Sequence, residues 1–409
     1  MIETIEVHIQ LGGNTRLVGH CRYTTKAHSQ SSVFEYADEW LSYSKAFALD
    51  PANLPLNSNS IYRSSEKSAL PGAIRDSAPD RWGRQLIRRA LRKSGEKRSL
   101  SQIDYLLAVS DPTRIGALRF RLQGETEFSD SLVDYQVPPL LQLPALLDAA
   151  NAVHNNTEAA EDLKLLLNAG SPLGGARPKS AVIDKCGTLA IAKFPKPDDY
   201  RSIPHGEILA LALARKSGIN AANAQLQNVA GRPVALIERF DRANDGKRIP
   251  FLSAMSLLGL SDGDIATYTD IAECIRMYSS APTEDLHELW RRIVFGIMIS
   301  NLDDHLRNHG FLYDGRQQWR LAPAYDLNPV PLEEKARELT TWIFEEGPEA
   351  SIELARSAAP YFALKNDQAQ KIITEVSSAI ANWRDVAGKL GMSSADIDEY
   401  ASAFGSAQT

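Results

Sequence analysis

Apolar and polar residues alternate with period two at the start of the chain. The alternation covers residues 2–13 and 16–24, which a Gly-Gly pair separates, and it predicts the two strands of a hairpin. A loop rich in proline and serine follows at 50–62, before the next stretch with helical spacing. Together these elements predict a small α+β subdomain over residues 1–125.

Short strands around a single helix are predicted next. Residues 126–165 carry apolar stretches that predict connecting helices, and a glycine-rich turn follows them. Strands are predicted at 179–185, 188–195, 224–231 and 232–242, with a helix at about 205–217 that ends at Gly218. Because this order is that of a kinase N-lobe, we expect connecting helices and such a lobe over residues 126–245.

Helical periodicity dominates after residue 250. Apolar positions recur with helical spacing over 264–280 and 283–302, and Leu and Ile side chains supply the apolar face of the second stretch. The chain has no internal repeat and no low-complexity tract. The pattern predicts a mainly helical C-lobe over residues 246–409, and an α+β fold for the whole chain.

Composition and charge narrow the classes of function. The 409 residues are 44% hydrophobic and 23% charged, which is ordinary for a folded globular protein. The net charge of −6 argues against a chain that by itself coats nucleic acid or an anionic membrane. Positive charge gathers at 75–98, a helix-like stretch capped near Asp76 or Asp80, which is either a surface for an acidic partner or a solvated helix face.

Cysteine spacing and the N-terminal residues indicate the cellular compartment in which the chain is expected to work. Cys21, Cys186 and Cys274 lie far apart without a CxxC pair, which excludes a zinc knuckle and argues against a disulfide framework. No secretory signal is visible, and the longest apolar run near the candidate site is too short to cross a bilayer. We therefore expect a cytoplasmic enzyme with reduced cysteines.

The segment NLDDHLRNHG, residues 301–310, has the layout of a phosphoryl-transfer site. Asp303 can orient or deprotonate a hydroxyl group. Asn308 and the later Asp326 can hold magnesium, which binds a few protein oxygens together with phosphate and water. In this interpretation His305 braces the loop around the catalytic aspartate.

A metal-dependent hydrolase is the alternative for the same segment. His305 and His309 are four residues apart, with Asp303 and Asp304 beside them. No HExxH pattern is present, however, and the residues after His309 predict a hairpin, which breaks helical spacing. The sequence thus favours phosphoryl transfer.

Five residues upstream are candidates for binding phosphate. Lys193 lies in an apolar strand and Glu207 in the first turn of the next helix, so the two can form the pair that positions nucleotide phosphates in kinases. Alternatively, Lys193 lies in water and Glu207 is favoured by the helix N-terminus. Gly174 and Gly175 either cradle phosphate with backbone N–H groups or form an ordinary turn. Lys179 is either a further phosphate contact or a solvated residue.

The segment ERFDR follows an apolar strand and precedes a change in composition. This position favours a hinge between two lobes, where the backbone groups of Glu238, Arg239 and Phe240 would meet an adenine ring. The charges of the segment can equally form local salt bridges.

The motifs GGARPKS, AIAKFP, HGEILALALARKSGI, ERFDR, NLDDHLRNHGFL and LAPAYDLNP, in this order, resemble the HipA family of bacterial serine/threonine kinases, the toxins of HipBA toxin–antitoxin systems. RDSAPDRWGRQLI and DPTRIGALRF resemble the N-terminal subdomain of that family, so the resemblance covers nearly the whole chain. It implies a divergent bilobal protein-kinase-like fold with an N-terminal α+β subdomain and a mainly helical C-lobe. It also implies a protein kinase that depends on ATP and Mg²⁺.

The resemblance assigns roles to individual residues. Asp303 matches the catalytic aspartate of the family's D-x-H-x-x-N motif, Asn308 and Asp326 its metal ligands, and Lys193 its ATP-phosphate lysine. Family members phosphorylate aminoacyl-tRNA synthetases and are held inactive by a helix-turn-helix antitoxin. The resemblance therefore implies such a protein substrate, a HipB-like partner, and contact with DNA only through that partner.

The family also inactivates itself by phosphorylating a serine in the glycine-rich loop. Ser171 is the candidate here, although the usual serine position falls on Pro172, so that Ser171 is displaced by one residue. Ser180 lies beyond Lys179 on the strand and fits less well.

Two other functions remain open. The chain can be a kinase-fold scaffold or corepressor that binds an antitoxin with little catalysis, although Lys193, Asp303, Asn308 and Asp326 are all intact. It can also be a small-molecule or phosphoinositide-like kinase, which the lack of a basic membrane-facing run in the C-lobe disfavours.

Overall fold

The chain forms two compact units, each assembled from two stretches of sequence. In the computed structural model the described residues are 2–26, 29–128, 137–169 and 175–407. Unit 1 consists of Met1–Pro197 and Arg239–Asp262, and unit 2 of Asp198–Glu238 and Gly263–Thr409. The division of the chain at residues 125 and 245 stays a prediction.

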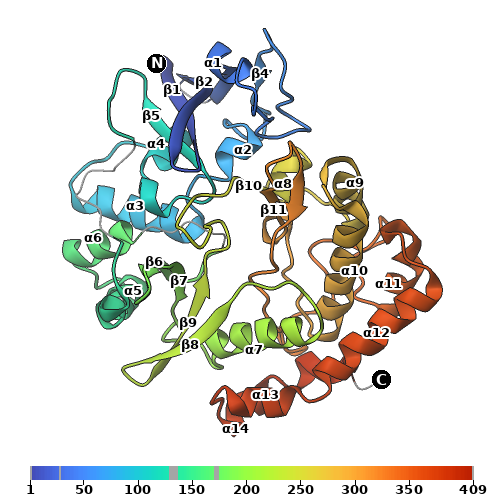
Figure 1. The fold of residues 1–409 in the computed structure, drawn as a ribbon. Coiled ribbons are helices and arrows are strands. Elements are labelled where there is room, and N and C mark those ends of the chain that lie inside the picture. The colour runs from blue at the N-terminus through green and yellow to red at the C-terminus, as the bar shows by residue number, and fades with distance from the viewer. Residues whose placement is uncertain (1, 27–28, 129–136, 170–174, 408–409) are drawn as a thin grey trace. The chain divides into compact units, whose positions relative to one another are not determined.

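Unit 1 opens with an antiparallel five-stranded sheet, drawn in blue to teal in Figure 1. Its strands in spatial order are β4 (Tyr62–Arg63), β3 (Ser29–Tyr36), β2 (Asn14–Lys26), β1 (Ile2–Leu11) and β5 (Leu118–Leu122). Gly12 and Gly13 have φ of 56° and 92°. Glycine adopts positive φ angles without strain, so this pair can form the tight turn between β1 and β2. The predicted hairpin is confirmed, whereas β3 was not predicted.

The rest of unit 1 consists of helices and short strands. They are α1 (Asp38–Leu41), α2 (Gly72–Arg75), α3 (Arg81–Lys93), α4 (Gln102–Leu107), α5 (Leu143–Asn155), α6 (Ala160–Asn168), β6 (Lys179–Ile183), β7 (Leu189–Lys193), β10 (Phe251–Ser253) and α8 (Ala254–Leu257). Strands β6 and β7 pair antiparallel. Asp80 caps α3, since its carboxylate accepts the Gly83 N–H at 2.8 Å, which confirms one of the two predicted caps.

Unit 2 is mainly helical. Its elements are α7 (Ile203–Lys216), β8 (Ala224–Val229), β9 (Arg232–Glu238), α9 (Tyr268–Tyr278), α10 (Pro282–Met298), β11 (Gly310–Tyr313), β12 (Trp319–Leu321), α11 (Ile352–Ala358), α12 (Asn366–Ile380), α13 (Trp383–Lys389) and α14 (Ser394–Glu399). The predicted apolar face of α10 is buried, and the hairpin predicted after His309 is present as β11–β12. Helix α10 ends directly before the candidate catalytic segment.

Two chemical expectations can be compared with the structure. None of the three cysteines is in a disulfide, as predicted. Within the part of the chain that the structure describes, every helix is too short or too polar to span a bilayer.

Candidate active site

In the segment after α10, the side chain of Asp303 is exposed to solvent, whereas nearby side chains are buried. Asp303 is exposed, while Asn301 and Asn308 on either side are 2% and 6% exposed. Asn301 accepts the backbone N–H of Asn328 at 2.9 Å, and Asn308 Nδ2 lies 3.4 Å from the carbonyl oxygen of Asp303. His305 donates its backbone N–H to the same carbonyl at 2.9 Å. The loop thus presents the Asp303 carboxylate to water from an anchored backbone.

Asp304 lies on the opposite side of this backbone, in the protein interior. Its carboxylate accepts a hydrogen bond from the Tyr268 hydroxyl at 2.6 Å, and His309 Nε2 lies 3.1 Å away. That separation suits an ion pair, but the ring nitrogen is not aligned for a hydrogen bond. The Thr341 hydroxyl donates to the Asp304 carbonyl at 2.6 Å. These contacts join α9 and the residues around Thr341 to the candidate catalytic segment.

The electrostatics of Asp304 follow from these neighbours. Burial by itself would raise the pKa of the carboxyl, but His309 and the Tyr268 hydrogen bond more than offset this and hold its pKa below the ordinary value. The pKa of Tyr268 is raised, first by burial and then by the adjacent carboxylate. Tyr268 therefore stays a neutral donor, and Asp304 stays an ionised acceptor.

Asp326 has a strained backbone. Its φ is 55°, in the left-handed region that residues other than glycine rarely adopt. Asn328 Nδ2 donates to its Oδ1 and its carbonyl, both at 3.1 Å, and the preceding Tyr325 donates its hydroxyl to the Arg307 carbonyl at 2.5 Å. The surrounding contacts therefore impose an unusual conformation on the predicted metal ligand.

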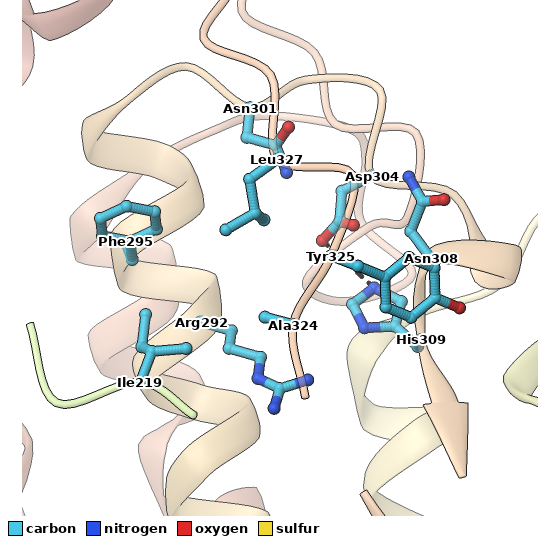
Figure 2. Close-up of a pocket in the computed structure, with 10 residues that line it drawn as sticks. All are labelled: Ile219, Arg292, Phe295, Asn301, Asp304, Asn308, His309, Ala324, Tyr325 and Leu327. Atoms are coloured by element: carbon cyan, nitrogen blue, oxygen red, sulfur yellow. Dashed lines mark ion pairs between the residues drawn. The ribbon is translucent and has the colours of Figure 1, made fainter. Parts of the chain in front are cut away.

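A pocket lies behind this segment (Figure 2). Its free space is small, about 10 Å³, which is room for about one water molecule. Its lining residues are Ile219, Arg292, Phe295, Asn301, Asp304, Asn308, His309, Ala324, Tyr325 and Leu327. Buried nitrogen atoms of Asn301, His305 and His309 have no hydrogen-bond partner among the described residues, so this region keeps polar groups available to a water molecule or a ligand.

The donor set fits magnesium rather than a histidine-bound metal. Asn308 and Asp326 offer an amide and a carboxylate, the hard oxygen ligands that Mg²⁺ takes alongside phosphate and water. His305 and His309 do not share a helix, because a short 3₁₀ turn at 306–308 leads into β11. No group of three or more His, Cys, Asp or Glu residues that could hold a metal is found among the described residues.

The upstream candidates are divided between the two units. Lys193 ends β7 in unit 1, and Glu207 is 2% exposed on α7 in unit 2, so their pairing stays a prediction. Lys179 is 2% exposed rather than solvated, and its Nζ lies 2.6 Å from Asp80 Oδ2. It sits directly opposite Lys193 in the β6–β7 register.

The glycine-rich turn is described only from residue 175. Gly175 has φ of 110°, and its carbonyl accepts the Trp82 N–H at 3.4 Å, while the Trp82 indole donates to the Lys179 carbonyl at 3.0 Å. The start of α3 therefore holds this turn in unit 1. Gly174 and Ser171 lie outside the described residues.

The predicted hinge contains an internal ion cluster. Arg239 is 3% exposed and donates two hydrogen bonds to Asp241, each 2.6 Å long. Burial would raise the pKa of Asp241, but Arg239 and Arg242 lower it to about 2. Glu238 is exposed, and Phe240 is half-buried. The local salt bridges considered for this segment are present, and any contact of Arg239 with a nucleotide would come from its backbone.

The sequence did not predict the roles of two sets of residues around the site. One comprises Asp80 and Trp82, which hold the loop at 175–179, and the other comprises Tyr268 and Thr341, which hold Asp304. All are far from their partners in sequence. The adjacent aspartates were the only indication of such contacts in the sequence, because two acidic side chains beside an apolar helix need hydrogen-bond or charge partners if they are buried.

Comparison with known proteins adds a family and a fold. A family model described as the HipA-like C-terminal domain matches residues 171–383, and one described as the HipA N-terminal domain matches residues 11–121. The solved structure of HipA from Shewanella oneidensis, in a complex with HipB and its operator DNA, is similar with a TM-score of 0.68. It shares 15% identity and covers 98% of this chain and 95% of that one, which confirms the predicted α+β, HipA-like fold.

Curated relatives match a shorter stretch. The protein named "Putative kinase Y4mE" from Sinorhizobium fredii is 30% identical over 148 residues, which is 34% of this chain and 33% of that protein. A Haemophilus influenzae protein with the name of a putative kinase is 26% identical over 154 residues, or 34% of this chain and 45% of its own length. The chain thus matches between a third and a half of the length of these relatives.

Proposed function

Because this chain belongs to the HipA family, we propose that it is a serine/threonine protein kinase that uses ATP and magnesium. One observation carries the proposal: the loop after α10 exposes Asp303 while anchoring the residues on both sides of it. A carboxylate held in this way can orient an incoming hydroxyl without reorganising its backbone.

Each residue of the site has a proposed role. Asp303 orients the substrate hydroxyl and accepts its proton. The side-chain amides of Asn301 and Asn308 anchor the loop backbone that carries this carboxylate. Asn308 and Asp326 would hold the magnesium ion, which supplies neutralisation of phosphate charge when bound. Lys193 adds a positive charge toward the phosphates, with Glu207 as its proposed partner.

Partners are proposed from the related complex. The Shewanella HipA is bound to HipB and operator DNA in its structure. By analogy, this chain would bind a helix-turn-helix antitoxin of the HipB kind and reach DNA only through it. The proposed target is a protein of translation such as an aminoacyl-tRNA synthetase, and Ser171 is the proposed site of autophosphorylation.

The direct test is incubation of the purified chain with labelled ATP and magnesium, followed by mass spectrometry. Wild type should incorporate phosphate, and both Asp303→Asn and magnesium chelation should abolish the incorporation. A circular dichroism spectrum of Asp303→Asn identical to that of wild type serves as the folding control, because Asp303 is exposed. Equal incorporation in wild type and Asp303→Asn would overturn the assignment, and phosphate on a residue other than Ser171 would move the regulatory site.

A further inference from the structure

The segment of residues 396–403 contacts three parts of unit 2 that lie near candidate site residues along the chain. These parts are the start of α7, the start of the catalytic loop, and the stretch after Asp326. The chain around this segment, drawn in red in Figure 1, also packs α13 against α7. The contacts are hydrogen bonds, together with the packing of the buried Tyr400 side chain.

At the start of α7, the segment binds both backbone groups of Ser202, the residue before the helix. The Tyr400 hydroxyl donates to the Ser202 carbonyl at 3.0 Å, and Asp396 Oδ1 accepts the Ser202 N–H at 3.0 Å. The Ser202 hydroxyl makes no capping bond to the helix and lies 2.7 Å from His205 Nδ1 instead. The orientation of the first turn of α7 thus depends on groups supplied from residues 396 and 400.

The contact between Tyr400 and α7 requires a glycine at position 206. A Cβ atom built on Gly206 would lie 2.2 Å from Tyr400 Oη and 2.6 Å from Cζ, closer than real Cβ contacts come. Gly206 has helical backbone angles, so its lack of a side chain serves the approach of Tyr400 rather than an unusual conformation. Tyr400 is 1% exposed, and it touches the helix one residue before Glu207.

The catalytic loop is held by the same segment. Ser300 precedes the loop, is fully buried and has φ of 53°. Its hydroxyl donates to the Ala403 carbonyl at 2.9 Å. The strained residue that redirects the chain from α10 into the loop is therefore fixed from residue 403.

The third part that contacts segment 396–403 is the stretch after Asp326. Ser402 Oγ accepts the Leu332 N–H at 3.1 Å. Arg201 lies 5.0 Å from the centre of the Tyr400 ring and forms an ion pair with Glu334.

We propose that residues 396–403 act as a brace that positions α7 and the catalytic loop for phosphoryl transfer, with Tyr400 as its central positioning residue. The inference rests on the proposed kinase function for its catalytic consequence, but the contacts do not depend on that function. Residues that touch no substrate thereby set the geometry of those that do.

The test uses the variant Gly206→Ala, for which helix propensity and the contact with Tyr400 predict opposite effects. Helix propensity predicts that alanine stabilises α7, whereas the clash with Tyr400 predicts displacement of the brace. We expect kcat to fall by about tenfold or more, as misplacement by an ångström can cause. Tyr400→Phe keeps the ring and loses one hydrogen bond, so a smaller fall is expected. Gly388→Ala is the matched control, because Gly388 is an exposed helical glycine of α13 with open space around it.

A double variant and an exchange measurement separate positioning from general damage. Gly206→Ala should add little to Tyr400→Ala, because its effect passes through the tyrosine. Hydrogen exchange of peptides covering 203–216 and 300–309 should quicken in Gly206→Ala but not in Gly388→Ala. If wild type proves inactive as a kinase, the exchange result alone decides the inference. Unchanged exchange at 300–309 in Gly206→Ala, or an unchanged kcat in an active enzyme, would overturn the brace.

Discussion

At the scale of single residues, the structure divides two adjacent aspartates between two tasks. Asp303 is exposed to solvent, while Asp304 is buried against Tyr268 and His309. The sequence identified the pair as costly to bury and placed the nucleophile-orienting role on Asp303. It did not identify the partners of Asp304, because Tyr268 and Thr341 lie more than thirty residues away and occur in no local pattern.

This division makes a prediction for Asp304→Asn. The variant keeps the shape of the side chain but loses the negative charge that faces His309 and accepts the hydrogen bond from Tyr268. A hydrogen bond to a charged group contributes about 1.5–3 kcal/mol, and the neutral amide weakens it. We expect stability to fall by about 1–2 kcal/mol and kcat to fall by about tenfold, with a smaller change in the KM for ATP. Steady-state kinetics and urea denaturation measure both effects.

Tyr268→Phe is the companion variant, since it removes one hydroxyl from the same carboxylate. Its effect should have the same direction and a smaller size. If Asp304→Asn retained the wild-type kcat, the buried carboxylate would have no part in positioning the loop.

At the scale of elements, local patterns were reliable where one face of an element is buried. The alternation of β1 and β2, the Gly-Gly turn, the apolar face of α10 and the β11–β12 hairpin all agree with the structure. Strand β3 was missed because it begins with the polar run Ser-Gln-Ser-Ser, and pairing with β2 rather than its own periodicity makes it a strand. The first and last residues of elements were also less predictable, because contacts with other elements rather than local periodicity decide where an element ends.

The start of α3 gives a prediction at this scale. Asp80 caps the helix through Oδ1 and pairs with buried Lys179 through Oδ2. Asp80→Asn keeps a capping oxygen but removes the negative charge of this ion pair, and breaking a buried ion pair from one side costs about 3–5 kcal/mol. We therefore expect a loss in that range, measured by urea denaturation followed by circular dichroism.

The double variant Asp80→Asn with Lys179→Met is the control. Replacing the lysine by an apolar side chain of similar length removes the buried positive charge as well, so most of the lost stability should return. A loss of about 1 kcal/mol or less in Asp80→Asn alone would show that water or another group already compensates Lys179.

At the scale of the whole molecule, unit 1 is held together by contacts between distant parts of the chain. Asn53 Nδ2 donates to the carbonyls of Ser256 and Leu257 at 2.9 and 3.1 Å, and also to Asp50 at 3.0 Å. Asp50 is fully buried, and its other oxygen accepts the backbone N–H groups of Ala52 and Asn53. Such pairings across two hundred residues cannot be inferred from one sequence.

Asp50 predicts how stability depends on pH. Burial raises its pKa to about 7 in the folded chain, although the hydrogen bonds from Asn53 and Ala52 act in the opposite direction. The folded state then holds a proton that the unfolded chain has already lost, so stability should fall as pH rises from about 4 to about 7 and then level off. Thermal midpoints between pH 4 and 8 measure this slope.

Asp50→Asn should flatten the slope, because the amide has no proton to lose. Asp314→Asn, at the half-buried start of the turn between β11 and β12, is the control and should follow wild type. Parallel curves for wild type and Asp50→Asn would contradict the prediction.

The interleaving of the two units has a consequence for synthesis. Unit 1 needs residues up to Asp262, by which time Asp198–Glu238 has already left the ribosome without the remainder of unit 2. Helix α7 lies in that early stretch and is buried along most of its length in the folded chain. At about 5–20 residues per second, the roughly 150 later residues take about 7–30 s to appear. During that interval α7 has β8 and β9 to pack against but lacks α12, α13 and the segment 396–403. Part of an apolar helix therefore stays uncovered, and we expect the nascent chain to be a client for chaperones.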